Sequence, residues 1–281
     1  MLLFGGILLA IAAGCGGPGE GSGAAGSTSS GTTENLSGEL TLVGSTTIQP
    51  VAEVLAEAYE SLHPDVMINV QGGGSSVGVT SAGQGTADIG MASRDIKASE
   101  FEEFPDIVVH TIARDGIAII ASPDVTVSDL SLDQIRGIFS GTIVSWRQVG
   151  GPDIPIVVIS REEGSGTRGA FEEMVMGEDA VISAAAILQP SNGAVLTTVA
   201  GTPSSIAYLS FGYINDSVKT ISIGGVAPTP ENAASGTYPV VRPLNLVTKG
   251  EPDELARSFI DFIYSADGQA IVVQEGYLSV N

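Results

Sequence analysis

Several residue types are scarce in this chain of 281 residues, and each scarcity excludes a class of protein. The single cysteine, Cys15, excludes an internal disulfide and any cysteine-based metal cluster. The two histidines are His63, which precedes a proline in a turn, and His110, which lies in an apolar run. Without a histidine pair there is little support for a metal site, so we expect no metal.

Positive charge is also scarce, because 11 Lys and Arg residues face 32 Asp and Glu residues and the formal net charge is −21. A nucleic-acid backbone or an anionic membrane surface would be repelled by such a chain. We therefore expect no nucleic-acid partner.

Apolar residues, by contrast, are plentiful and occur in short runs. They make up 43% of the chain, and aromatic residues make up only 5%. Runs such as 117–120 and 156–159 favour buried strands with helices packed on both faces. Strands are expected at 39–43, 66–70 and 88–91, with a helix at 47–62 between the first two. This alternation predicts an α/β fold with mostly parallel sheets.

The N-terminus carries an apolar run, 2–13, that is too short to cross a bilayer as a stable helix. It ends in Ala12-Ala13-Gly14-Cys15, which resembles the site at which a lipoprotein leader is cut and its cysteine is lipidated. The alternative is an apolar N-terminus with an incidental cysteine. Residues 16–38 are rich in Gly, Ser and Thr, which predicts a flexible tether.

Four segments place small hydroxyl residues and glycines where a strand gives way to a helix: 44–47, 72–76, 92–95 and 161–167. The start of a helix offers unpaired N–H groups and the positive end of its dipole, which together bind anions. The alternative for any one segment is an ordinary helix cap or turn. Four such openings in one chain, two of them with an arginine, favour an oxyanion site.

Two motif matches point to other functions. Gly164 to Gly169 fits the dinucleotide pattern G-x-G-x-x-G, but 161–163 separates it from the preceding strand, and no acid follows about twenty residues on to hold a ribose. The segment 74–78 fits the nucleophile elbow G-x-S-x-G around Ser76. That elbow predicts a secreted serine hydrolase or phosphatase, for which neither histidine is suitably placed.

The segment 132–171 is the most specific part of the chain. It contains Ile138-Phe-Ser-Gly141, Trp146, Gly150-Gly151, and Ile156-Val-Val-Ile-Ser-Arg161 leading into Gly164-Ser-Gly-Thr-Arg168. With these motifs the sequence resembles the substrate-binding proteins of phosphate ABC transporters, from residue 40 to the C-terminus. The resemblance implies the two-lobed periplasmic-binding-protein fold of type II. The segments 107–121 and 238–247 would cross between lobe 1 (39–112 and 241–281) and lobe 2 (113–240).

The resemblance also implies a set of phosphate ligands from the four segments. They are Ser45, Thr46, Thr47, Ser75, Arg161, Ser165, Gly166 and Thr167. Gly166 would contribute only its N–H group, and Glu163 would pair with the guanidinium of Arg161.

The turn formed by Ser93, Arg94 and Asp95 departs from the family, in which an aspartate directly follows this serine and accepts the proton of phosphate. If Arg94 points into the cleft, proton-based rejection of sulfate becomes doubtful. If Asp95 does, that selection survives. A surface ion pair between Arg94 and Asp95 is the third possibility.

The resemblance therefore implies an extracytoplasmic, lipid-anchored monomer that delivers inorganic phosphate to membrane permease subunits, which work with a cytoplasmic ATPase. Such a binding protein carries out no reaction, so we expect no enzyme activity and no cofactor. The alternatives are the same fold binding sulfate, molybdate or tungstate, and a phosphate sensor or adhesion-like surface protein that never meets a permease.

Overall fold

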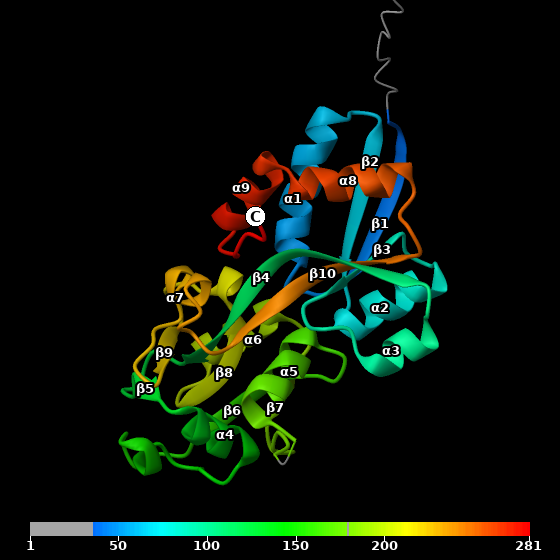
Figure 1. Ribbon diagram of the computed structural model, residues 1–281. Helices are drawn as coiled ribbons and strands as arrows, with labels where there is room; N and C mark the ends of the chain where they lie inside the picture. Colours follow the sequence, from blue (N-terminus) through cyan, green and yellow to red (C-terminus); the bar gives the residue numbers. More distant parts are fainter. Residues whose placement is uncertain (1–35, 179) are drawn as a thin grey trace, which may run out of the picture. The chain divides into compact units, whose positions relative to one another are not determined.

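The computed structural model describes residues 36–281 apart from residue 179 (Figure 1). The predicted leader, Cys15 and most of the predicted tether lie outside the described residues. The first strand begins at Gly38, and Leu36 already packs against the core. The folded body therefore begins slightly before the predicted end of the tether.

Strands and helices alternate along the described chain, as the sequence predicts. The strands are β1 (Gly38–Gly44), β2 (Val66–Gly72), β3 (Ile89–Ala92), β4 (Ile107–Ala121), β5 (Asp129–Leu130), β6 (Val157–Arg161), β7 (Ile187–Gln189), β8 (Ser205–Ser210), β9 (Lys219–Ile223) and β10 (Val241–Lys249). The α-helices are α1 (Gln49–Leu62), α2 (Ser75–Gln84), α3 (Ala98–Glu103), α4 (Leu132–Ser140), α5 (Gly166–Phe171), α6 (Asn192–Gly201), α7 (Pro230–Ala234), α8 (Glu254–Tyr264) and α9 (Ala266–Gln274).

The strands join in the order β2-β1-β3-β10-β4-β8-β6-β7, with β9 also paired to β4 and β5 to β9. Pairs joined by helices are parallel, as in β1 with β2 and β3 and in β6 with β7 and β8. The central strands β10 and β4 are antiparallel to each other and to their outer neighbours. The sheet is mixed, and the α/β prediction is confirmed.

The buried apolar side chains form two main clusters, which define two lobes. The cluster of lobe 1 draws on β1–β3, the first half of β4, β10, and helices α1, α8 and α9. The cluster of lobe 2 draws on the second half of β4, strands β5, β6, β8 and β9, and helices α4–α7. Figure 1 shows β4 and β10 side by side where the chain passes from one lobe to the other.

The long apolar segment expected at 107–121 matches the bounds of β4, whereas β10 begins three residues after the start of the expected segment 238–247. Tyr238 and Val240 are instead buried in the core of lobe 2. Within the described part of the chain, no helix combines the length and the apolar character that a membrane crossing needs.

Candidate functional site

Residues from all four predicted segments line one small space between the lobes. They are Ser45, Thr46, Thr47, Gly74, Ser75, Ser93, Arg161, Ser165, Gly166 and Thr167, which we call the hydroxyl cluster. All the ligand residues predicted from the sequence belong to it except Arg94 and Asp95. The cluster contains seven serine and threonine residues. Thr46 is the most exposed of them, at 9%, and the other six are more deeply buried.

Each opening of the cluster is formed by a strand end that turns into a helix. The Ser45 hydroxyl follows β1 and accepts the N–H group of Thr47 at 3.1 Å, which caps the turn that leads into α1. Gly74 precedes α2 with φ 91°, a backbone conformation that favours glycine. The hydroxyl of Ser165 accepts the N–H group of Arg168 at 3.3 Å and caps α5. The starts of α2 and α5 and the turn before α1 therefore line the cluster, and a helix start is a favourable place for an anion.

Arg161, the last residue of β6, brings a buried positive charge to the cluster. Its side chain is 1% exposed, and its Nε and Nη2 atoms donate to the carbonyls of Gln189 at 3.1 Å and Pro190 at 2.9 Å. Burial lowers the pKa of Arg161 to about 10, so the guanidinium stays protonated at neutral pH. Among the described residues no carboxylate forms an ion pair with it.

Glu163 does not occupy the place expected for it. It is exposed, whereas backbone carbonyls hold the guanidinium of Arg161, and the described residues show no ion pair between the two side chains. The chain turns sharply through Gly164, at φ 88°, directly after Glu163. Arg161 and Glu163 are only two residues apart in the sequence, but the carbonyls of Gln189 and Pro190 hold the Arg161 side chain, whereas Glu163 is exposed.

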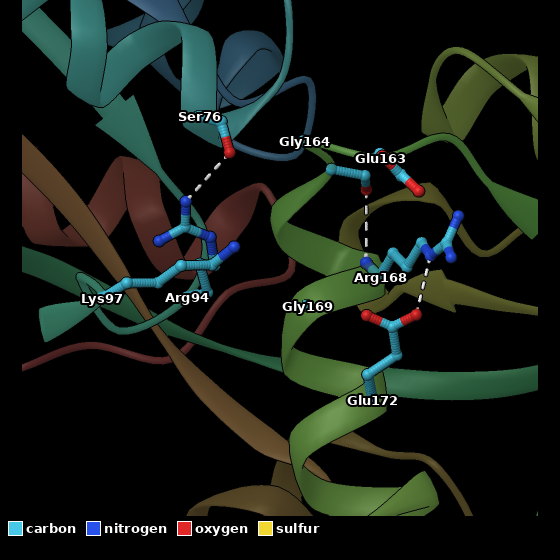
Figure 2. Close-up of a pocket in the computed structure, with 9 residues that line it drawn as sticks. Ser76, Arg94, Lys97, Glu163, Gly164, Arg168, Gly169 and Glu172 are labelled. Atoms are coloured by element: carbon cyan, nitrogen blue, oxygen red, sulfur yellow. Dashed lines mark hydrogen bonds and ion pairs between the residues drawn. The ribbon is translucent and has the colours of Figure 1, made fainter. Parts of the chain in front are cut away.

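Arg94 lines a neighbouring cavity of about 330 Å³ rather than the hydroxyl cluster. Figure 2 shows its guanidinium directed at Ser76, whose hydroxyl it reaches at 3.2 Å. Its ion pair is with Glu100, at 2.7 Å. Asp95 is exposed and accepts from Arg94 only through its backbone carbonyl, so the described side chains of Arg94 and Asp95 form no surface ion pair.

Two charged residues that the sequence analysis missed lie against the cluster. Arg242 on β10 pairs with Asp115 on β4 at 2.7 Å, and both side chains are essentially unexposed. Arg242 also donates to the hydroxyl of Thr47 at 3.1 Å and to the carbonyl of Ser93 at 3.0 Å. Burial raises the pKa of the Asp115 carboxyl, and the charge and hydrogen bonds of Arg242 oppose that rise. The sequence did contain a signal for this ion pair. Each of the two segments predicted to cross between the lobes contains one of these charged residues, and a buried charge needs a partner.

Asn192, the first residue of α6, is a third residue that was missed. Its side chain is fully buried, and its Nδ2 atom donates to the hydroxyls of Thr46 at 3.4 Å and Thr47 at 2.9 Å. These two hydrogen bonds are among several contacts that join lobe 2 to the loop before α1. The sequence offers no clear signal for it, because asparagine is common at the start of a helix.

Other hydrogen bonds hold the two lobes together around the cluster. The hydroxyls of Thr47 and Thr167 lie 3.1 Å apart, and Tyr213 donates to the carbonyl of Thr46 at 2.6 Å. The helix start at Gly166 approaches lobe 1 so closely that a methyl group there would lie 2.6 Å from the hydroxyl of Ser93. The described conformation is therefore closed.

The nucleophile-elbow interpretation of Ser76 finds no base in the structure. The hydroxyl of Ser76 accepts from Arg94, His63 packs against the ring of Tyr59, and His110 contacts Thr248 at 3.0 Å. Among the described residues there is also no group of three or more His, Cys, Asp or Glu side chains that could hold a metal ion.

Comparison with known proteins gives consistent results. A family model described as a PBP superfamily domain matches residues 22–267. The phosphate-binding protein PstS of Bacillus subtilis is 38% identical over 282 residues, which cover 100% of this chain and 93% of that protein. The PstS protein of Borreliella burgdorferi is 30% identical over 84% of this chain and 88% of its own length.

Solved structures agree with these relatives. A Clostridium perfringens protein described as a phosphate ABC transporter substrate-binding protein, with bound phosphate, superposes with a TM-score of 0.84 at 42% identity, covering 87% of this chain and all of that one. An ABC-type phosphate transport receptor from Vibrio cholerae gives a TM-score of 0.72 at 35% identity, covering 85% of this chain and 99% of its own.

Proposed function

This chain belongs to the PBP superfamily, among its phosphate-binding proteins, and from that membership we propose that it captures inorganic phosphate in the hydroxyl cluster. It is the substrate-binding component of a phosphate ABC transporter and not an enzyme. Its task is to bind and release an ion, so the site needs no catalytic group.

The observation that carries this function is the buried, unpaired charge of Arg161. Burying a guanidinium without a counter-ion is costly. Among the described residues, no carboxylate pairs with Arg161 to offset its charge. The surrounding hydroxyls and helix N-termini are hydrogen-bond donors. An anion that enters the cluster supplies the missing negative charge and accepts from these donors.

The overall negative charge of the chain does not oppose this binding. Charges more than about 8 Å apart in solvent are screened at physiological ionic strength, so the nearby donors dominate. Closure of the lobes then replaces the water around the ion by fixed N–H and O–H groups. The contacts of Thr47 with Thr167 and of Thr46 with Tyr213 stabilise this closed form.

The surroundings of the protein follow from the same role, since the binding components of ABC importers work on the outer side of the cell membrane. We propose that the chain acts as a monomer, anchored through a lipid on Cys15 by the tether 16–38, and docks on membrane permease subunits. We also propose a division into lobe 1 (39–112 and 241–281) and lobe 2 (113–240). The separate apolar clusters support it, although Ala113 packs in the cluster of lobe 1 and Leu278 in that of lobe 2.

The test is a calorimetric titration of the purified protein with phosphate, sulfate and molybdate. Phosphate should bind in a one-to-one complex and more tightly than either other anion. Tighter binding of sulfate or molybdate, or no binding of phosphate at all, would refute the proposed substrate. A parallel assay with phosphoesters should show no turnover.

A further inference from the structure

A cavity beside the strands that cross between the lobes shares no lining residue with the hydroxyl cluster. Its volume is about 430 Å³, and α7 of lobe 2 forms one wall while the end of α9 and the segment after it form the other. Figure 1 shows α7 and this last segment next to β4, whose Arg114 also lines the cavity. We call the cavity the hinge groove, and its walls include Pro230, Glu231, Ala234, Val273, Tyr277 and Leu278.

The segment after α9 is a third connection between the lobes, beside β4 and β10. Leu278 and Arg114 exchange two backbone hydrogen bonds, of 2.9 Å and 2.8 Å. Tyr277 packs in the apolar cluster of lobe 1, and its neighbour Leu278 packs in that of lobe 2. Because both lobes build the groove, the distance between its walls depends on how the lobes are placed. The described groove therefore belongs to the closed conformation.

The guanidinium of Arg114 has no carboxylate partner among the described residues. All eight arginines are described and six of them form ion pairs, so the exceptions are Arg114 and Arg161 of the hydroxyl cluster. Glu231 is the one carboxylate side chain among the described residues that line the groove. Its own N–H group and the hydroxyl of Thr229 lower the pKa of Glu231, which holds that carboxylate at the start of α7. Arg114 can therefore bind an anion from outside the chain.

The walls beside Arg114 are largely apolar. Val273 lines one wall and is 55% exposed, and Pro230 and Ala234 line the other. Sites for small molecules commonly measure about 300–1,000 Å³ and combine apolar walls with a few polar groups that fix the orientation of the ligand. A guanidinium binds a carboxylate through two parallel N–H···O hydrogen bonds. The groove therefore suits a carboxylate that is attached to an apolar body.

Tyr277 connects the groove with the hydroxyl cluster. Its side chain is 2% exposed, and its hydroxyl donates to the carbonyl of Thr47 at 2.8 Å. Its ring also packs on Gly212 of lobe 2, where a methyl group would lie 2.5 Å from the ring. A ligand between the two walls of the groove thus contacts a residue that supports the anion site on one side and touches the other lobe on the other.

We propose that the hinge groove binds a small carboxylate with an apolar body, such as a medium-chain fatty acid, and that this ligand stabilises the closed form. A ligand shifts a conformational equilibrium only if it binds one conformation better than the other, and the walls keep the described spacing only while the lobes are closed. The ligand and phosphate should therefore raise each other's affinity by the same factor, about fivefold or more. The groove itself does not depend on the proposed function, whereas its effect on phosphate rests on it.

The experiment titrates octanoate, and octanol as its uncharged match, into the phosphate-bound protein by calorimetry. Octanoate should bind about tenfold more tightly than octanol, the worth of a hydrogen bond between charged groups. Arg114→Gln should remove this difference, whereas Arg257→Gln, which removes an exposed arginine from α8, is the control and should keep it. Ala234→Trp, which fills the groove, should abolish octanoate binding. Saturating octanoate should lower the Kd of phosphate about fivefold or more in the unmodified protein.

Equal binding of octanoate and octanol by the unmodified protein would overturn the role of Arg114, and this result does not depend on any variant folding. No octanoate binding, or unchanged binding in Arg114→Gln or Ala234→Trp, would overturn the groove as the site. An unchanged Kd of phosphate in saturating octanoate would overturn the coupling. Failure of the unmodified protein to bind phosphate would instead refute the proposed function, and octanoate titration of the phosphate-free protein would still test the groove.

Discussion

The guanidinium of Arg242 lies 2.7 Å from the carboxylate of Asp115, and both side chains are almost completely buried. The two residues belong to the neighbouring strands β10 and β4, along which the chain passes between the lobes. Because Arg242 also donates to Thr47 and to the carbonyl of Ser93, this ion pair joins the crossing strands to the anion site.

Breaking this pair should destabilise the protein strongly. Asp115→Ala leaves Arg242 as an uncompensated buried charge, and the expected loss in the free energy of unfolding is about 3–5 kcal/mol. Urea denaturation of the ligand-free protein measures it. The double variant Asp115→Leu with Arg242→Met removes both charges and should lose less than the single variant. Equal losses in the two proteins would show that the unpaired charge is not the cause.

Removing the donors of the cluster should weaken phosphate binding. Arg161→Ala and Thr167→Val are each expected to cost about 1.5–3 kcal/mol of binding free energy, the worth of a hydrogen bond to a charged group. Calorimetry checks both values. Arg136→Ala, which removes an exposed arginine on α4, is the control and should bind phosphate as the unmodified protein does. Wild-type affinity in either cluster variant would refute the site assignment.

The contact between Tyr213 and the carbonyl of Thr46 should contribute to closure. Tyr213→Phe removes a hydrogen bond of 2.6 Å between the lobes, and phosphate affinity should fall by about 0.5–1.5 kcal/mol with faster release of the ion. The matched control is Tyr277→Phe, because Tyr277 donates to the carbonyl of Thr47 within lobe 1. Calorimetry measures the phosphate affinity of each variant, and stopped-flow measures the rate at which each releases phosphate. An equal change in the release rate of both variants would contradict a role of Tyr213 in closure.

A methyl group at Gly166 should prevent full closure. It would collide with the hydroxyls of Ser75 and Ser93 across the cleft, so Gly166→Ala is expected to weaken phosphate binding by at least about 1–3 kcal/mol, the usual cost of overpacking. Gly201→Ala at the end of α6 meets no described atom within 4 Å and serves as the control. Titration of both variants checks this, and unimpaired binding by Gly166→Ala would show that the helix start does not approach lobe 1 in solution.

The ion pair of Glu100 with Arg94 should make stability depend on pH at the acid end. Burial alone would raise the pKa of Glu100, but the hydrogen bond and charge of Arg94 and the N–H group of Lys97 hold it below its ordinary value of 4.5. A lowered pKa in the folded protein stabilises it above pH 4.5, and this contribution disappears as the pH falls through the folded value.

The difference in unfolding free energy between the unmodified protein and Glu100→Gln should therefore be largest near neutral pH and shrink as the pH falls below 4.5. Urea denaturation between pH 3 and pH 7 measures it. Glu103→Gln, which removes an exposed carboxylate from the same helix, should not reproduce this change. A difference that stays constant across the range would contradict the ion pair.

The sequence predicts the fold well because apolar periodicity is a local property. The buried strand 107–121 and the helix starts after β1 and β6 depend only on neighbouring residues, and the structure has them close to their expected bounds. The clustering of the hydroxyl segments also follows from sequence order, because the ends of the strands that precede them meet at one edge of each lobe.

The partners of the charged side chains could not be predicted in the same way. Arg94 and Asp95 are adjacent in sequence, but the backbone directs the first to Glu100 and the second to solvent. The contact of Arg242 with Asp115 joins residues 127 positions apart, and only the antiparallel register of β4 and β10 brings them together. Such pairings depend on tertiary structure, which a single sequence does not display.

The division of lobe 1 between the two ends of the described chain has a consequence for the order of assembly. Strand β3 acquires its neighbour β10, and helix α1 acquires α8 and α9, only when residues 241–274 join the fold. Most of lobe 2 is one continuous segment whose core needs few residues from this part of the chain. The lobe that contains β1 therefore depends on both ends of the described chain, and until β10 pairs with β3 its sheet has an open edge that can pair with another chain.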